Sequence, residues 1–177
     1  MTASRLGLAA VVVAFSGLLA GMAAAQSSKE AGALSVSRGA RTEAVSAAEF
    51  AALPHVKVHV TQHDQSHDFE GVPLGALVAK VGADVSQPLK GKDLSAAIRV
   101  TAADGYQVVL ALSEIDPATR RAQVLLADRD GGKPLDAANG PWRLVVSDDI
   151  RPARSARQVQ KIEVVDLATS TKRPAAK

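Results

Sequence analysis

The residues with the most obvious chemical potential are four histidines at a constant spacing of four, His55, His59, His63 and His67. On an α-helix this spacing would place all four imidazoles on one face, as in helical metal sites. The valines between positions 56 and 60, however, alternate with polar residues, which is typical of a strand with one buried face. A hairpin here would bring His59 and His67 together beside Asp64 and Asp68, and imidazole with carboxylate suits Zn(II), Ni(II) or Cu(II). The alternatives are a metal site at His59, His63 and His67 and a solvated hairpin face without metal, and we favour the second.

Other signatures of catalysis are absent from the sequence. There is no Gly-x-Ser-x-Gly elbow, no glycine-rich phosphate loop before Lys-Ser or Lys-Thr, and no Cys-x-x-Cys pair, since the chain contains no cysteine. Asp104, Asp128, Asp130 and Asp136 lie in or next to turn sequences, where aspartate is favoured because it bonds to the backbone. The sequence therefore does not decide whether the protein is an enzyme, and the lack of catalytic motifs favours a protein that is not.

The charge balance gives little reason to expect a nucleic-acid partner. The net charge is only +3 and aromatic residues make up 3% of the chain. Few side chains are therefore available for stacking on bases, and no helix carries regularly spaced Lys or Arg. We predict no nucleic-acid binding.

The first 25 residues are typical of a secretory signal peptide. Residues 1–5 carry one positive charge, residues 6–20 are almost wholly apolar, and Ala23 and Ala25 supply small side chains before Gln26. The apolar run is shorter than the ~20 residues that span a bilayer as a helix. We expect cleavage after Ala25, a periplasmic or secreted protein, and no stable membrane anchor after cleavage; an uncleaved anchor is the alternative.

The remaining chain has the length of one domain. We predict a flexible linker over residues 26–45, in which Leu34 and Val36 could form a short edge strand, a domain over residues 46–167, and a basic tail over residues 168–177. An exported chain without cysteine has no disulfides, so this domain must be stabilised by its core. Because aromatic residues are scarce, the core must consist of Val, Leu, Ile and Ala.

Within the domain, short strands and short helices follow one another in no regular βαβ order. Ser46 and Glu49 have the spacing of a capping box, and Pro54 ends the helix that they open. Asp104-Gly105 marks a hairpin turn. We predict an α+β domain of mixed and antiparallel short strands, with helices at 73–81 and 113–116 and strands at 56–61, 69–72, 97–101, 106–112, 122–127, 142–146 and 159–165.

Several blocks of sequence resemble the molybdopterin-binding domain of the sulfite oxidase family. They are Phe-Glu-Gly-Val-Pro-Leu at 69–74, Asp-Gly-Tyr at 104–106, Asn-Gly-Pro-Trp-Arg-Leu-Val-Val at 139–146, Arg-Pro-Ala-Arg-Ser-Ala-Arg at 151–157 and Lys-Ile-Glu-Val at 161–164. The resemblance covers roughly residues 56–165. It implies a truncated version of that fold, an oxidoreductase ancestry and a molybdopterin cofactor.

The resemblance also implies roles for five residues. Tyr106 matches an active-site tyrosine, Asn139 and Arg143 match residues that contact the pterin, and Ser155 and Arg157 match a Ser-x-Lys segment that grips its phosphate. A phosphate favours a cation and hydroxyl donors that converge on it, and arginine would keep the charge of lysine with a different geometry. The alternatives are structural: a strand tyrosine at a hairpin edge, an Asn-Gly turn, and a solvated basic rim.

Two departures from the family pattern weigh against a cofactor. The family holds molybdenum through a cysteine thiolate, which this chain lacks, and residues 62–68 stand where the family has a long segment that builds the pocket. Asp64 and Ser66 are the nearest substitutes for the thiolate.

We therefore expect a non-catalytic, exported module without a bound cofactor. Its partner would be a small anionic ligand or a periplasmic protein, bound along a basic edge beside Tyr106 that consists of Arg143, Arg154 and Arg157. The alternative is a periplasmic molybdopterin-dependent oxidoreductase of the sulfite oxidase type without a cysteine ligand.

Overall fold

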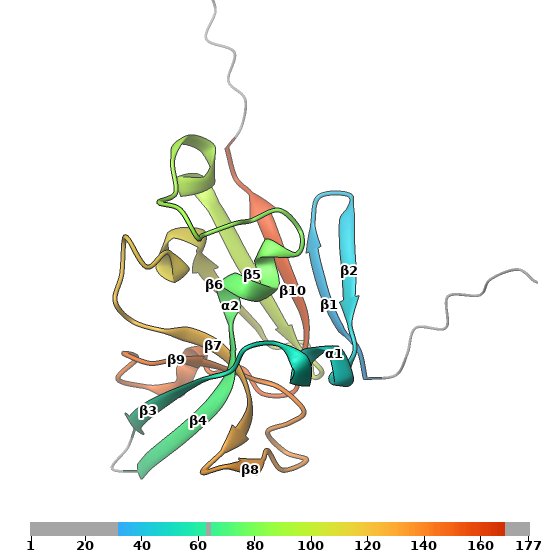
Figure 1. Cartoon of the computed structure of the whole chain (residues 1–177), viewed down its shortest axis with the longest axis vertical. Coiled ribbons are helices and arrows are strands. Elements are labelled where there is room, and N and C mark those ends of the chain that lie inside the picture. The colour runs from blue at the N-terminus through green and yellow to red at the C-terminus, as the bar shows by residue number, and fades with distance from the viewer. Residues whose placement is uncertain (1–31, 63–64, 169–177) are drawn as a thin grey trace, which may run out of the picture.

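Ten short strands form two five-stranded sheets in the computed structural model, which describes residues 32–62 and 65–168 (Figure 1). The signal peptide expected at residues 1–25 and nearly all of the basic tail lie outside the described residues. The elements, in chain order, are β1 (Leu34–Arg38), β2 (Arg41–Val45), α1 (Ala47–Ala52), β3 (Val56–Gln62), β4 (Gln65–Pro73), α2 (Leu74–Ala79), η1 (Gly91–Ser95), β5 (Ala96–Ala102), β6 (Gln107–Ala111), η2 (Leu112–Ile115), β7 (Val124–Asp130), β8 (Lys133–Pro134), β9 (Arg143–Val146), η3 (Pro152–Arg154) and β10 (Val159–Asp166), where η marks a 3-10 helix.

The first sheet has the strand order β2-β1-β10-β5-β6, with β1 parallel to β10 and the other pairs antiparallel. It corrects our expectation for residues 26–45, because residues 34–45 form the hairpin β1–β2 instead of a linker. Leu34, Val36 and Val45 are almost completely buried, and this apolar burial holds the segment on the sheet. Strand β1 is also no edge strand, since it lies between β2 and β10.

The second sheet is built around β7, which pairs with β4 on one side and with β8 and β9 on the other. The apolar run at residues 124–127 is buried throughout. Val124 and Leu126 face the main core, whereas Leu125 and Ala127 belong to a smaller cluster on the other face with Phe69. A strand buried on both faces has a continuous apolar sequence, which agrees with the position of β7 between β4 and the pair β8 and β9.

Local sequence signals mark both ends of α1 and the start of α2. In α1, the Ser46 hydroxyl accepts a hydrogen bond from the Glu49 backbone N–H, and the Glu49 carboxylate accepts one from the Ser46 backbone N–H. Helix α2 follows Pro73, and its C-terminal turns close at Gly82, whose φ of +83° suits glycine. The helix itself ends two residues earlier than the predicted 81, because its last turns are not α-helical.

The main core lies between the two sheets and consists mostly of Val, Leu, Ile and Ala, with Phe50 and Trp142 at one side. This confirms the composition predicted for it. Strands from both sheets and the inward face of α2, with Leu74, Leu77 and Val78, meet in this core. The fold is the predicted α+β arrangement of short mixed and antiparallel strands. Among the described residues, no helix is long and apolar enough to cross a membrane.

Candidate functional site

Three of the five residues singled out by resemblance line one hollow of about 360 Å³. Tyr106 follows the Asp104-Gly105 turn between β5 and β6, and Ser155 and Arg157 follow η3, which precedes β10. Tyr106 is half exposed, and its hydroxyl donates a hydrogen bond of 2.7 Å to the Ala153 carbonyl. The tyrosine therefore ties the hairpin turn to η3 and forms one wall of the hollow.

Gln158, which also lines the hollow, has a positive φ of 49°. Its N–H donates to the Asn139 carbonyl at 3.1 Å, its carbonyl accepts from the Ala103 N–H at 3.0 Å, and its side-chain amide donates to the Ala137 carbonyl at 2.7 Å. A non-glycine residue keeps this conformation only where its surroundings fix it. These three bonds fix the orientation of residues 155–158 relative to the turn at 104–106.

Arg157 is the exposed cation of the hollow. Within the described parts of the chain, it forms no hydrogen bond or ion pair. Its charge helps to lower the pKa of Asp136, although the main cause is hydrogen bonding from the Asn139 side chain and backbone. Asp104 also lines the hollow, but its carboxylate already accepts a 2.9 Å hydrogen bond from the Tyr106 N–H. Arg157 is thus available to a ligand, and an anion is the ligand that it would attract.

Asn139 and Arg143 are not among the residues that line the hollow. The Asn139 amide donates to the Asp136 carboxylate at 2.8 Å and accepts from Arg143 at 3.3 Å. The guanidinium of Arg143 lies 5.1 Å above the centre of the Phe69 ring, and its Nε is buried without a hydrogen-bond partner. Burial lowers the pKa of Arg143, and the charge of Arg157 acts in the same direction.

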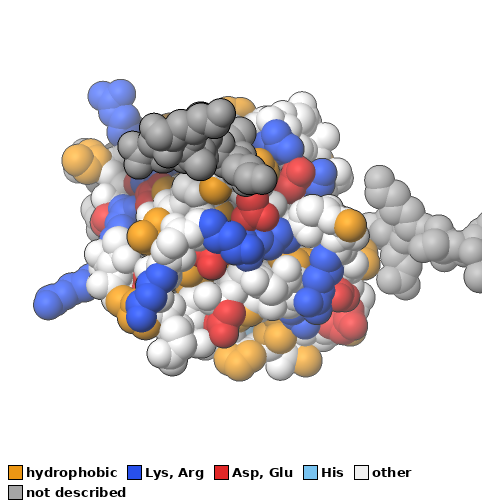
Figure 2. All heavy atoms as spheres, turned by 90° about the horizontal axis from the view of Figure 1, so that it is seen from above, with side chains coloured by type: hydrophobic (Ala, Val, Ile, Leu, Met, Phe, Trp, Pro, Cys, Tyr) orange, Lys and Arg blue, Asp and Glu red, His pale blue; other side chains and the backbone are white. Residues whose placement is uncertain are grey.

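Arg154, like Arg143, is not among the residues that line the hollow, so of the basic edge predicted at Arg143, Arg154 and Arg157 only Arg157 lines it. The guanidinium of Arg154 is bound by Asp149 at 2.6 Å and by Glu114 at 2.8 Å, and Glu114 also pairs with Arg120. These hydrogen bonds raise the pKa of Arg154 above its ordinary value. Charges of both signs are likewise interspersed on the face seen in Figure 2.

The histidines do not converge, because the strand register separates them. Antiparallel pairing of β3 with β4 sets His59 opposite Asp68 and Val60 opposite His67. Side chains alternate between the two faces of a strand, so His59 and His67 lie on opposite faces, and the expected pairing in the hairpin is wrong. His63 lies outside the described residues. In the part of the chain that the structure describes, no three His, Cys, Asp or Glu side chains are placed to hold a metal ion.

Each of the three described histidines instead meets an aspartate. His59 Nδ1 lies 2.7 Å from Asp68, and His67 Nδ1 lies 2.6 Å from Asp130, while the His67 ring stacks on Phe69. His55 lies deeper: its Nδ1 donates to the Leu53 carbonyl at 2.7 Å, and its Nε2 faces Asp128 at 3.4 Å. These are local pairs within and beside the second sheet.

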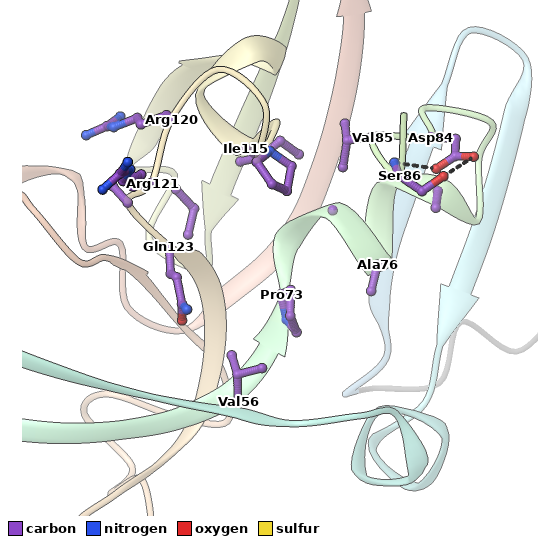
Figure 3. Close-up of a pocket in the computed structure, with 15 residues that line it drawn as sticks. Val56, Pro73, Ala76, Asp84, Val85, Ser86, Ile115, Arg120, Arg121 and Gln123 are labelled. Carbon is purple, nitrogen blue, oxygen red and sulfur yellow. Dashed lines mark hydrogen bonds between the residues drawn. The ribbon is translucent and has the colours of Figure 1, made fainter. Parts of the chain in front are cut away.

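Sequence reasoning missed a larger, mostly apolar groove of about 620 Å³ beside α2 (Figure 3). Figure 3 shows Arg120, Arg121 and Gln123 on one side and Asp84, Val85 and Ser86 on the other, with α2 between them. The available signals were weak: small residues on the outer face of α2 and an Arg-Arg pair before β7. Neither signal indicates a cavity until the two connections that enclose it are placed.

The fold is similar to that of a solved oxidoreductase. The sulfane dehydrogenase SoxCD from Paracoccus pantotrophus matches with a TM-score of 0.58 and 16% sequence identity, over 76% of this chain and 38% of that chain. The present chain thus spans well under half of the matched chain. No family model matches this sequence, and no curated protein matches it. The similarity supports a distant oxidoreductase-like fold.

The described residues do not fit the molybdopterin that the sequence resemblance implies. The chain offers no cysteine thiolate, and Asp64 lies outside the described residues. Ser66 bonds to Thr61 at 3.1 Å on the face of β3–β4 opposite Phe69, whereas Arg143 covers Phe69. A substitute ligand at Ser66 and a pterin contact at Arg143 would therefore lie on opposite sides of the sheet. Gln62 pairs directly with Gln65. A short hairpin therefore stands where the sulfite oxidase family has the long segment that builds its cofactor pocket.

Proposed function

We propose that this protein is an exported, non-catalytic module with an oxidoreductase-like fold that binds a small anionic ligand. The observation that carries the proposal is that Tyr106, Ser155 and Arg157 line one hollow. Among the described residues, Arg157 has no hydrogen-bond or ion-pair partner there. An anion there would receive a charge-assisted hydrogen bond from Arg157. The ligand would contain a phosphate or a group of similar charge, since the resemblance relates this segment to a phosphate grip.

Inorganic phosphate is a suitable first probe for the hollow. We expect saturable shifts of the backbone amide resonances at residues 103–107 and 155–158 when phosphate is added to the mature protein. Arg157→Gln should weaken binding about tenfold or more, because a hydrogen bond to a charged group contributes about 1.5–3 kcal/mol. Added sodium chloride should also weaken it through screening.

A matched control is Lys133→Gln, which removes an exposed cation from β8 outside the hollow. This variant should bind phosphate as the parent does. Equal losses in both variants would mean that phosphate responds only to net charge, and the proposed site would then be rejected. Shifts spread over the whole surface would have the same meaning.

Export and the oxidoreductase alternative need separate measurements on the chain produced with its own leader. We expect the protein in the periplasm or medium, with Gln26 as its first residue. Elemental analysis after production in a host that makes molybdopterin tests the alternative. About one molybdenum per chain would replace the binding-module proposal with an oxidoreductase.

A further inference from the structure

We propose that the groove beside α2 is a second ligand site, which takes a small amphipathic anion such as a medium-chain aliphatic carboxylate. The groove shares no lining residue with the hollow at Tyr106, so this inference does not rest on the proposed function. It lies where the chain twice crosses between the sheets. Residues 84–86 belong to the connection from β4 to β5, and residues 115–123 belong largely to the connection from β6 to β7.

The size of the groove suits a small molecule. Its volume of about 620 Å³ falls within the ~300–1,000 Å³ of typical small-molecule sites, which are mostly apolar with a few polar groups. The wall contributed by α2 is six residues long, or about 9 Å at the rise of an α-helix. That length matches a short alkyl chain and is small for a partner helix.

Small side chains create the space. Ala76 and Ala79 are exposed on the outer face of α2 and line the groove. Gly75 allows the opposite wall to approach, since a Cβ at this position would lie 2.7 Å from Val85 Cγ2. Ile115 and Pro117 complete an apolar surface, from which an alkyl chain would displace water favourably.

The charges around the groove favour an anion. Arg121 is exposed and, within residues 32–62 and 65–168, has no hydrogen-bond or ion-pair partner. Arg120 is already engaged by Glu114 and Asp148. On the far side, the Asp84 carboxylate accepts hydrogen bonds from the backbone N–H and the hydroxyl of Ser86, at 2.8 and 3.1 Å (Figure 3). Ser86 is neutral, so Asp84 keeps its negative charge, but it lies on the other side of the groove from Arg121 (Figure 3), and an anionic head group would therefore bind at the Arg121 side.

The test is a titration of the mature protein with octanoate, followed by the amide resonances of the lining residues. Octanol and octylammonium serve as neutral and cationic probes with the same chain. We expect saturable shifts confined to the groove, and octanoate should bind about tenfold more tightly than octanol and more tightly still than octylammonium. Octylammonium binding as well as octanoate would overturn the assignment of an anion, and no saturable binding below about 10 mM would overturn the site.

Two substitutions separate the contributions of shape and charge. Ala76→Leu adds bulk on the exposed face of α2 and should abolish binding of both octanoate and octanol. Arg121→Gln should weaken octanoate about tenfold and leave octanol unchanged. Arg151→Gln, an exposed arginine outside the groove, should change neither probe. The proposal is overturned if Ala76→Leu, shown to be folded by its spectrum, still binds octanoate, or if Arg121→Gln and Arg151→Gln lose equal affinity.

Discussion

The hollow at Tyr106 and the groove beside α2 are built in different ways. Polar side chains define the hollow, and a network of backbone hydrogen bonds through Gln158 holds them in place. The groove is mostly apolar, and it exists because small residues on α2 leave a gap between two crossover connections. The hollow depends on particular polar side chains. The groove depends on the space that remains between α2 and the two connections that pack beside it.

This difference affects how each site should respond to substitution. Charge changes should affect the hollow strongly, because little apolar surface is available to compensate for a lost ion pair. Bulk changes should affect the groove strongly, because its ligand would gain most from removing apolar surface from water. The following substitutions range from one that destabilises the scaffold shared by both sites to one that alters the groove alone.

Gly71→Ala should destabilise the scaffold that the two sites share. A Cβ on Gly71 would lie 2.1 Å from the Leu126 carbonyl oxygen and 2.5 Å from Ala127 Cα, so β4 and β7 would have to separate. We expect a loss of about 3 kcal/mol or more in the free energy of unfolding, at the upper end for overpacking, measured by urea denaturation. Gly39→Ala, where no atom lies within 4 Å, should cost only about 1–2 kcal/mol for its positive φ. Similar losses in the two variants would contradict this interpretation.

Glu114→Gln should destabilise the protein at neutral pH, although Glu114 lines neither the hollow nor the groove. Burial acts to raise the pKa of Glu114, but hydrogen bonds from Arg154 and the Ala111 N–H, together with the charges of Arg154 and Arg120, lower it below its ordinary 4.5. Such a group stabilises the fold above its unfolded pKa, and this contribution is lost as pH falls through the lowered pKa. We expect a loss of about 1 kcal/mol at pH 7, after allowance for solvent screening.

The pH dependence provides the control for this prediction. The difference in stability between the parent and Glu114→Gln should shrink as the pH is lowered from 5 towards 3 in urea denaturation experiments. Glu43→Gln, which removes the exposed partner of Arg41, should change stability by less than about 0.5 kcal/mol. A difference for Glu114→Gln that stays constant with pH would show that its carboxylate charge is not responsible.

Tyr106→Phe should loosen the hollow and leave the groove unchanged. The substitution removes the hydroxyl that donates to the Ala153 carbonyl but keeps the ring. Because that side chain is half exposed, we expect about 0.5 kcal/mol or less in stability and a threefold or greater loss of phosphate affinity by NMR titration. Unchanged phosphate affinity would assign Tyr106 a purely structural role.

Gly75→Ala should alter the groove alone. Its added methyl group would push against Val85 Cγ2, the end of a side chain that can rotate, so stability should change little. We expect a few-fold change in octanoate affinity and no change in phosphate affinity, with Gly39→Ala again as the control. A parallel change in phosphate affinity would indicate that the two sites are coupled.

Much of the fold could be predicted because local patterns agree with the tertiary structure. The capping box at Ser46 and Glu49, the alternation from residue 56 and the apolar run at 124–127 each indicate their element without knowledge of the rest. The β1–β2 hairpin could not be predicted in this way. Its strand β1 pairs with β10, more than 110 residues away, and the local composition of Ser, Ala and Gly is typical of a linker.

The histidines show a similar limit for the candidate sites. Their spacing is visible in the sequence, but the register of β3 against β4 decides which of them share a face, and a shift of one residue would reverse the result. The arginines differ for a related reason. Arg154 is engaged by Asp149 and Glu114, and Arg157 is not, although the two lie three residues apart.

By itself, the sequence determined the types of element, the aliphatic core and the lack of a thiolate ligand. These properties follow from local periodicity, composition and turn chemistry, which act over a few residues. Only the tertiary structure decided which cations are free, which faces the histidines occupy, and that a groove lies beside α2. Each of these depends on contacts between segments far apart in the chain, and the groove depends on the absence of side chains large enough to fill a gap between them.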